Sequence, residues 1–502
     1  MLTQEDIGPE PPPRRPEYTP ARDLGGPERT ERERRVSWWI LLAIGAAYLV
    51  SQLLLFPFGR PSNWDEAVYL SQVTPGMEGL FMAAWRSRGI TLLVAPVTLL
   101  GGSLSDVRLY LMIVSAAAVT SSFGIWIPLI GFAAPIAAIL FSFTWLGLIN
   151  GSAVMPNFWA ALLGVAVAGL VARRLEGGSL AHAVLAAALL GAMALVRPTE
   201  ATVMVGVIGL YLLIVRRTSW RFGLGLGVGF VLGWLPWVLE MSIRFGGFRN
   251  ALRQARSAGH LALAPVGENV LAHLSFTYGR AKLAPDVVPL EGILWWSLLV
   301  VLSVIALRRG VGSPARSVAL FSFLATAAFA LEYLVLVPVV AARFLLPAYA
   351  FAAITAAIGL ASLLRSGTAA RIVGAVLLVL IVPWAVWQGE VGTRVLDNQL
   401  LPADKLFAAG LALKDLADGR PCSFVSPANH PQVQIASGCD GGQLTSPAPT
   451  AAQLEAVAAG EEVFIILGHP ARAGSPLADL EPTHLRAVRR PWFVYQLSEL
   501  RR

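Results

Sequence analysis

The sequence predicts an all-α polytopic membrane bundle of about eleven spans, followed by a small α/β domain at the C-terminus. Of the 502 residues, 56% are hydrophobic and only 14% are charged, whereas a soluble domain carries about a quarter charged residues. Apolar runs of about 17–25 residues recur along the chain, and each is long enough to cross roughly 30 Å of hydrocarbon. Backbone polar groups in lipid must be satisfied within their own segment, so these runs should be helices.

The N-terminal tail, residues 1–35, mixes Pro, Arg and Glu without an apolar period and is predicted to be disordered. The first apolar run begins near Trp38 and has no small-residue cleavage site behind it, so we expect an anchor helix and not a signal peptide. The transmembrane domain follows over 36–388. Its expected spans are 38–56, 107–124, 131–149, 152–172, 180–196, 199–215, 222–240, 292–307, 317–337, 343–364 and 370–388.

Arginine clusters in the short loops predict the orientation of this domain. They are Arg34–Arg35, Arg173–Arg174, Arg216–Arg217, Arg308–Arg309, and Arg365 with Arg371. All of them fall on one side when the expected spans alternate, and the positive-inside rule makes that side the cytoplasm. We therefore expect a multi-pass protein of a bacterial-type plasma (inner) membrane with a cytoplasmic N-terminus. The net charge of +8 is then a topology signal, and no nucleic-acid partner is predicted.

The opposite, outer face receives three longer segments. The first outer loop, 57–106, contains an apolar stretch, Gly89–Leu100, which is interrupted by Pro96, is too short to span, and is expected to lie along the membrane interface. The second outer loop, 241–291, carries four arginines between positions 244 and 256, spaced so that they share one face loosely if the segment is helical.

The third segment, 389–502, is polar enough to form an extracytoplasmic α/β domain. Strands are predicted at 422–426, 462–468 and 492–497, and helices at 403–416 and 451–459. Cys422 and Cys439 are the only cysteines of the chain. Outside the cytoplasm such a pair is more often a disulfide than a metal site, although two buried free thiols are the alternative.

The candidate chemistry begins with two adjacent carboxylates, Asp65 and Glu66, directly after the first span. Ionisable groups at a membrane usually face a cavity or a partner. A partly desolvated carboxylate also has a raised pKa, which makes it a better general base near neutral pH. The alternatives are a solvated loop acid, or a helix that begins near Glu66 and has Asp65 at its N-terminus.

These residues resemble a motif of a known enzyme class. A first span, an Asp-Glu-x-x-Tyr sequence (Asp65, Glu66, Tyr69) and an interfacial apolar stretch are similar to the GT-C membrane glycosyltransferases. The resemblance is to the group of protein O-mannosyltransferases and the lipid A aminoarabinose transferase, and it covers 38–388. The segments Leu195–Glu200 and Ala342–Pro347 also resemble that group.

The resemblance implies inverting transfer of a sugar from a polyprenyl-phosphate carrier to a glycan, lipid or protein acceptor at the outer face. Asp65 would be the general base on the acceptor hydroxyl, and Glu66 would orient the site or bind the acceptor. Some enzymes of this class use a divalent metal, with an acid such as Asp65 as one ligand. No second ligand can be assigned in this sequence, so metal dependence stays open.

The leaving lipid phosphate needs cations at the interface, preferably arginine with its bidentate fork. Arg343 is the first candidate because it begins a span and matches the family pattern, and its alternative role is to snorkel at a helix end. Further candidates for binding the lipid phosphate or acceptor are Arg86, Arg88, Arg197 and Tyr69, and plain interfacial anchoring is the alternative for Arg86 and Arg88. Glu332, inside a late span, would contact the acceptor or pair with Arg343.

Two other classes of function compete with the enzyme. A transporter or lipid flippase would show internal repeats and broken helices at the membrane midplane, and a non-catalytic scaffold would use the C-terminal domain to bind envelope partners. An ATP-driven pump, an oxidoreductase and a zinc protease are disfavoured because the sequence lacks their motifs. A groove at the outer face lined by both Asp65 and Arg343 would favour the enzyme, and a continuous polar route across the bilayer would favour transport.

Overall fold

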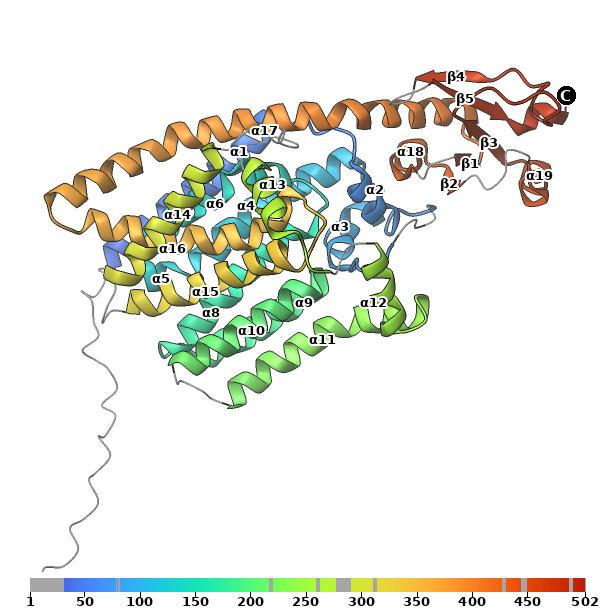
Figure 1. The fold of residues 1–502 in the computed structure, drawn as a ribbon. Coiled ribbons are helices and arrows are strands. Elements are labelled where there is room, and N and C mark those ends of the chain that lie inside the picture. The colour runs from blue at the N-terminus through green and yellow to red at the C-terminus, as the bar shows by residue number, and fades with distance from the viewer. Residues whose placement is uncertain are drawn as a thin grey trace, which may run out of the picture.

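The computed structural model describes residues 31–77, 79, 82–215, 220–258, 262–276, 290–309, 314–426, 430–443, 449–486 and 491–501. Within these ranges the chain forms a bundle of long helices with a small sheet at one end (Figure 1). The predicted fold class, a helical membrane bundle with a C-terminal α/β domain, is confirmed. Of the predicted N-terminal tail, only its last five residues are described, and they are helical because α1 begins at Glu31.

Nine helices in the described ranges are long and apolar enough to cross a membrane. They are α1 (Glu31–Leu55), α4 (Leu104–Gly124), α8 (Pro156–Leu175), α10 (Pro198–Val215), α11 (Trp220–Arg244), α14 (Leu290–Arg309), α15 (Pro314–Val335), α16 (Leu346–Leu364) with the 3-10 turn η1 (Ala342–Leu345) before it, and the first part of α17 (Thr368–Ala417).

The expected count of eleven is reached only with two irregular segments. The run 131–149 is a pair of helices, α6 (Ala133–Ser142) and α7 (Trp145–Gly151), bent by 77°. The bend follows from Thr144, whose hydroxyl accepts a hydrogen bond from the Gly147 N–H and starts a new helix. A short helix, α5 (Ile127–Ile130), precedes this pair. The other segment is α9 (Leu180–Val196), whose 17 residues are at the lower limit for a span.

The two ends of the bundle differ. At one end of Figure 1, α1, α11, α15 and α17 begin, and the described arginines of the expected cytoplasmic clusters belong to helix ends at this side, such as Arg173 and Arg174 in the last turn of α8. At the opposite end lie α2 (Trp64–Ser71), α3 (Gly89–Leu99) and α12 (Phe248–Ser257). Helix α13 (Val266–Phe276) packs beside the end of α15, where Asn269 donates to the Tyr333 and Val337 carbonyl oxygens. The apolar stretch of the first outer loop is thus the short helix α3.

The arginines of the second outer loop do not share a single helix. Arg244 ends α11, and Gly246 and Gly247 then adopt positive φ values of 67° and 96°, which interrupt the helix. The three later arginines lie on α12, where their side chains are exposed. Positions 259–261 and 277–289 of this loop lie outside the described residues.

The C-terminal sheet has the strand order β2-β1-β3-β5-β4. Its strands are β1 (Cys422–Ser426), β2 (Asp440–Gln443), β3 (Glu462–Leu467), β4 (Thr483–Arg486) and β5 (Pro491–Gln496). Strand β1 is parallel to β2 and β3, and β5 is antiparallel to β3 and β4. The sequence did not predict β2 and β4 because each has four residues with no apolar alternation.

Apolar side chains fill both faces of this sheet. The end of α17 and the short helix α18 (Pro431–Ser437) cover one face, where Leu413 and Val433 pack on Phe424. Helix α19 (Ala451–Ala458) and the final turn η2 (Leu497–Arg501) cover the other. A disulfide joins Cys422 to Cys439.

Helix α17 connects the membrane bundle to this domain without a break (Figure 1). It has 50 residues, which corresponds to about 75 Å at 1.5 Å per residue. The domain boundary expected at 389 therefore lies inside α17, and the helix predicted at 403–416 is its last part. Helix α18 packs against both α17 and α2, so the domain contacts the helix that carries Asp65.

Candidate functional site

Asp65 lies in the first turn of α2, which a capping box fixes at its start. The Asn63 side chain accepts a hydrogen bond from the Glu66 N–H, and the Glu66 carboxylate accepts one from the Asn63 N–H. The helix therefore begins at Trp64, two residues before the position expected from the sequence.

Both carboxylate oxygens of Asp65 are bound by arginines from distant parts of the chain. Arg86, in the segment before α3, donates to Oδ1 at 2.5 Å, and Arg343, in η1, donates to Oδ2 at 2.6 Å. The side chain of Asp65 is 24% exposed, so water still reaches it. The three residues form one charge cluster at the end of the bundle that carries α2 and α3.

This cluster reverses the expected pKa of Asp65. Burial raises the pKa of this carboxyl, but the charges of Arg343 and Arg86 and the hydrogen bond from Arg86 lower it more, so the net pKa lies below the usual value. The expectation of a raised pKa was wrong because burial was considered without the two cations. In this state Asp65 is ionised and is a weak base.

The two arginines retain unused hydrogen-bond donors. The Nε atoms of Arg86 and Arg343 are buried and have no hydrogen-bond partner among the described residues. The guanidinium of Arg86 also lies 5.2 Å from the ring centroids of both Trp64 and Tyr69, which hold it by cation–π contacts. The pair can therefore accept a further anionic or polar ligand.

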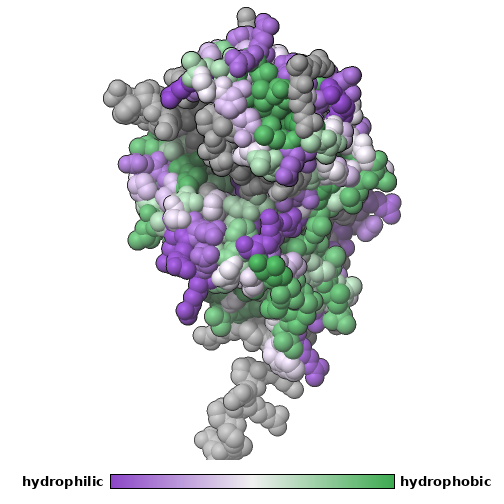
Figure 2. Space-filling model, turned by 90° about the vertical axis from the view of Figure 1, so that its right-hand side faces the viewer, coloured by the Kyte–Doolittle hydropathy of each residue, from purple (hydrophilic) through white to green (hydrophobic). Residues whose placement is uncertain are grey.

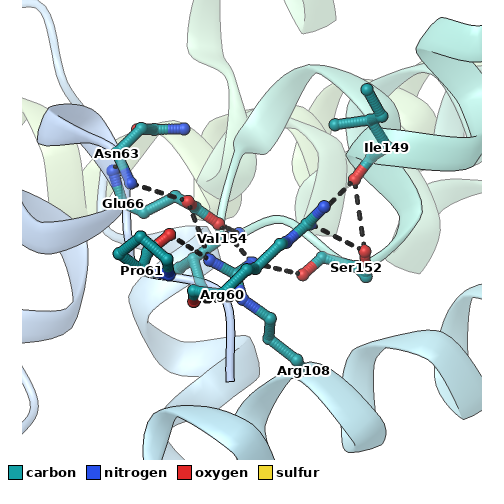
Figure 3. A network of polar contacts seen from close by, with 8 residues as sticks. All are labelled: Arg60, Pro61, Asn63, Glu66, Arg108, Ile149, Ser152 and Val154. Atoms are coloured by element: carbon teal, nitrogen blue, oxygen red, sulfur yellow. Dashed lines mark hydrogen bonds and ion pairs between the residues drawn. The ribbon is translucent and has the colours of Figure 1, made fainter. Parts of the chain in front are cut away.

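Glu66 has a different set of partners, buried behind α2 (Figure 3). Arg108 of α4 donates to both of its oxygens at 2.8 and 3.1 Å, and the Val154 N–H donates at 3.0 Å. Burial raises the pKa of Glu66, but Arg108 and Arg60 lower it to about 2. Burial likewise lowers the pKa of Arg60 to about 9.

Arg108 is a site residue that was not predicted from the sequence, and the structure shows that it is fully buried. The sequence did contain a signal for it, because a charged residue within an apolar helix usually has a function or a buried partner. Arg108 also donates to the carbonyl oxygens of Pro61 and Ser152, so it ties the start of the first outer loop to the turn before α8. The network thereby fixes the position of α2.

The other predicted arginines pair differently. Arg197 donates to Glu200 at 2.7 Å and to the Tyr333 hydroxyl at 2.7 Å. Arg88 binds Glu240 of α11 through Nε and Nη2, at 2.7–3.1 Å. The expected pairing of Arg343 with Glu332 is absent among the described residues, because Arg343 is engaged by Asp65.

One cavity of about 630 Å³ brings most of the predicted site residues together. Its polar wall is formed by Asp65, Tyr69, Arg86, Asn157, Arg197, Thr199, Thr202, Glu332, Tyr333 and Arg343. Aromatic side chains complete it: Trp85, Trp234 and Phe344. Of the predicted residues that the structure describes, Glu66 and Arg88 do not line this cavity. Seen from the end that carries the C-terminal domain, hydrophilic residues gather between that domain and the apolar helices (Figure 2).

A divalent metal does not fit this cluster of side chains. In the described part of the chain, no three His, Cys, Asp or Glu side chains are grouped so that they could hold an ion. The oxygens of Asp65 face two guanidinium groups, which repel a cation. The arrangement is suited to an anion.

The architecture of the chain matches solved membrane glycosyltransferases. No protein-family model matches the sequence, and no curated protein matches it by sequence. Among solved structures, ArnT from Cupriavidus metallidurans bound to undecaprenyl phosphate superposes with a TM-score of 0.63 at 14% identity, over 91% of this chain and 98% of ArnT. The archaeal oligosaccharyltransferase AglB from Archaeoglobus fulgidus, in complex with an inhibitory peptide and a dolichol-phosphate, gives a TM-score of 0.51 at 11% identity, over 85% of this chain and 69% of AglB. The chain therefore has the GT-C fold that its sequence resemblance predicted.

Proposed function

We propose that the protein is a glycosyltransferase that moves a sugar from a polyprenyl-phosphate carrier to a glycan, lipid or protein acceptor at the outer face of the plasma membrane. The observation that carries the proposal is the position of Asp65 between Arg86 and Arg343 in the wall of a large cavity. A carboxylate suits a general base, and two guanidinium groups suit a lipid phosphate. The undecaprenyl phosphate bound to ArnT and the dolichol-phosphate bound to AglB support a ligand of this class.

Donor binding would activate Asp65. In the free protein the two arginines occupy both carboxylate oxygens and hold its pKa low. A lipid phosphate is a competing anion for the same guanidinium groups, whose Nε donors are unused. When the phosphate takes over hydrogen bonds from the arginines, Asp65 loses its stabilising partners and its pKa rises toward that of a useful base.

The transfer itself is a single displacement. The acceptor oxygen forms a bond to the anomeric carbon of the sugar while its proton passes to Asp65. The bond between that carbon and the phosphate oxygen breaks, and its electron pair leaves with the polyprenyl phosphate. Arg86 and Arg343 stabilise this negative charge. Attack on the face opposite the phosphate inverts the configuration at the anomeric carbon.

Two further features support the proposed orientation. The cavity and the disulfide-bonded domain share the end of the bundle opposite the arginine-rich helix ends, and disulfides persist outside the cytoplasm. The clustering of the charged cavity residues at this end favours an enzyme over a transporter, which would need a polar route through the bilayer. The scaffold alternative does not account for a carboxylate bound by two arginines with spare donors.

The test combines a deletion strain with variants. We expect the strain that lacks the protein to lose one envelope sugar and to accumulate its lipid-linked precursor, and the wild-type protein to restore both. Asp65→Asn keeps the shape but removes the base, so it should lower transfer about 100-fold or more. Asp404→Asn, at an exposed position of α17, is the matched control. Full restoration by Asp65→Asn would remove Asp65 as the base, and unchanged envelope sugars in the deletion strain would overturn the proposed function.

A further inference from the structure

Two polar side chains in the cavity wall have no role in the proposed chemistry, and each has one buried atom without a hydrogen-bond partner in the described part of the chain. Glu332, in the last turn of α15, is 8% exposed, and its Oε2 atom has no hydrogen-bond partner among the described residues. Asn157, in the first turn of α8, is 1% exposed, and its Nδ2 atom likewise has none. Both side chains line the same cavity as Asp65.

Such groups are unusual in a folded protein. A buried polar atom without a partner loses its hydration and gains nothing in return, and most buried polar groups are therefore paired. The neighbouring charges of the cavity are paired: Asp65 with Arg86 and Arg343, and Arg197 with Glu200. An unpaired acceptor and an unpaired donor in one cavity wall indicate a ligand that satisfies both.

The chemistry of the two groups selects the kind of ligand. The Glu332 carboxyl group offers oxygen acceptors and no cation, so it does not belong to the anion site of the arginine pair. An acceptor together with a donor suits a hydroxyl group, which donates and accepts, or an amino group beside a hydroxyl. Tyr333 and Phe344, whose rings stack with centroids 5.0 Å apart, line the same cavity and offer apolar faces beside these polar groups.

The donor sugar is the ligand that meets these requirements. It is bonded directly to the phosphate, so a phosphate at Arg86 and Arg343 places the sugar in the same cavity. We infer that Glu332 and Asn157 form the sugar-recognition subsite, in which Glu332 accepts and Asn157 donates hydrogen bonds to hydroxyl or amino groups of the transferred sugar. This inference rests on the proposed function. Glu332 was predicted to bind the lipid phosphate or the acceptor, and it is here assigned to the sugar instead.

The experiment measures lipid binding by the purified full-length protein with three probes. These are undecaprenyl phosphate without a sugar, the same lipid carrying mannose, and the same lipid carrying aminoarabinose. The variants are Glu332→Gln, which keeps an acceptor without charge, Glu332→Leu, which keeps only the volume, and Asn157→Ala. Glu268→Gln, at an exposed position of α13, is the matched control.

We expect at least one sugar-bearing lipid to bind wild type more tightly than the bare lipid. Glu332→Leu should lower the affinity for that sugar-bearing lipid about tenfold, because a buried hydrogen bond to the sugar is lost and its partner is left unsatisfied. Asn157→Ala should remove a smaller part of it. The affinity of every variant for bare undecaprenyl phosphate should stay within about twofold of the wild-type affinity. A loss in Glu332→Gln confined to the aminoarabinose lipid would assign an amino group as the partner, and an equal loss for both sugars would assign a hydroxyl group.

The outcomes separate this inference from the proposed function. If wild type binds none of the three lipids, the proposed function fails. If wild type binds the bare lipid but neither sugar increases its affinity, or if the Glu332 variants keep the full increase, the subsite is overturned while the lipid-phosphate site stands. A variant that does not fold is identified by its loss of bare-lipid binding, and in that case Glu332→Gln decides the outcome.

Discussion

Asp65 and Glu66 are neighbours in the chain, but their carboxylates are bound by different arginines. Asp65 is held by Arg86 and Arg343 in the wall of the cavity, whereas Glu66 is held by Arg108 in the interior. The first pair of contacts can be exchanged for a ligand, and the second cannot without unpacking the loop. We therefore assign chemistry to Asp65 and positioning to Glu66.

The positioning role predicts a stability defect in Glu66→Gln. The change leaves the fully buried charge of Arg108 without its counter-ion, and removing one partner of a buried ion pair costs about 3–5 kcal/mol. The melting temperature of the purified protein should fall, while molecules that remain folded keep their affinity for undecaprenyl phosphate.

A second substitution tests the cause of this defect. In Glu66→Gln with Arg108→Met the unpaired charge is gone, so part of the lost stability should return. Glu268→Gln should change stability by less than about 0.5 kcal/mol. A single variant as stable as wild type, or a double variant worse than the single one, would contradict the assignment.

The stabilising contribution of Glu66 depends on pH. The folded protein lowers the pKa of Glu66 from 4.5 to about 2, so the unfolded chain takes up a proton first as pH falls. The contribution is therefore complete above about pH 4.5 and is lost between pH 4.5 and about 2. The difference in melting temperature between wild type and Glu66→Gln should narrow over this range, and a constant difference would contradict the ionised pairing.

Local sequence patterns were sufficient to predict most of the fold and to identify Asp65 as the candidate acid of the site. Apolar runs located the helices, and the Asp-Glu-x-x-Tyr motif located Asp65. The bend between α6 and α7 was not expected, because an apolar run of adequate length gives no sign of the cap made by Thr144. The two shortest strands were missed for lack of an apolar alternation.

Long-range pairing explains the remaining errors. Arg108 meets Glu66 across 42 positions of sequence, and Arg343 meets Asp65 across 278. A prediction that considered the burial of Asp65 without these partners gave the wrong direction for its pKa. Arg88 was predicted, like Arg86, to bind the lipid phosphate or acceptor, but its side chain binds Glu240 instead.

Arg343 and Arg88 should therefore differ in lipid binding. Arg343→Ala removes a cation from the cavity, and we expect a loss of about tenfold or more in affinity for undecaprenyl phosphate. Arg88→Ala removes a contact between the start of α3 and α11, so it should lower the melting temperature and weaken lipid binding far less. Arg253→Ala, at an exposed position of α12, serves as the control for charge. Equal losses in the Arg343 and Arg88 variants would contradict an anion site at Arg343.

The disulfide can be tested by experiments that need no substrate. Alkylation of the native protein should modify no cysteine, and alkylation after reduction should modify two. The bond closes a separation of 17 residues, for which the loop-entropy model gives about 3 kcal/mol of stabilisation. Replacing both Cys422 and Cys439 by alanine should make the C-terminal domain more sensitive to protease. Two reactive thiols in the native protein would contradict the pairing.

The contact of the C-terminal domain with α2 predicts that the domain influences catalysis. Gly410 of α17 lies so close to α18 that an added Cβ would be 2.6 Å from the Ala436 Cβ and 2.7 Å from the Val433 oxygen. Gly410→Ala must therefore displace α18, which packs against α2. We expect transfer to fall several-fold, with a smaller effect on binding of bare undecaprenyl phosphate, because α2 carries Asp65 and the lipid phosphate also contacts other elements.

A substitution at a second glycine is the control that separates displacement of α18 from a general effect of replacing glycine by alanine. An added Cβ at Gly225, in α11, would meet no atom within 4 Å. Gly225→Ala should be neutral or stabilising by up to about 1 kcal/mol, since alanine favours the helix. If Gly410→Ala lowers stability but leaves turnover per folded molecule unchanged, the C-terminal domain does not influence catalysis and the prediction is wrong. If turnover falls while the melting temperature holds, α18 sets the position of the catalytic helix, because the changed contact joins α17 to α18 and involves no residue of the cavity wall.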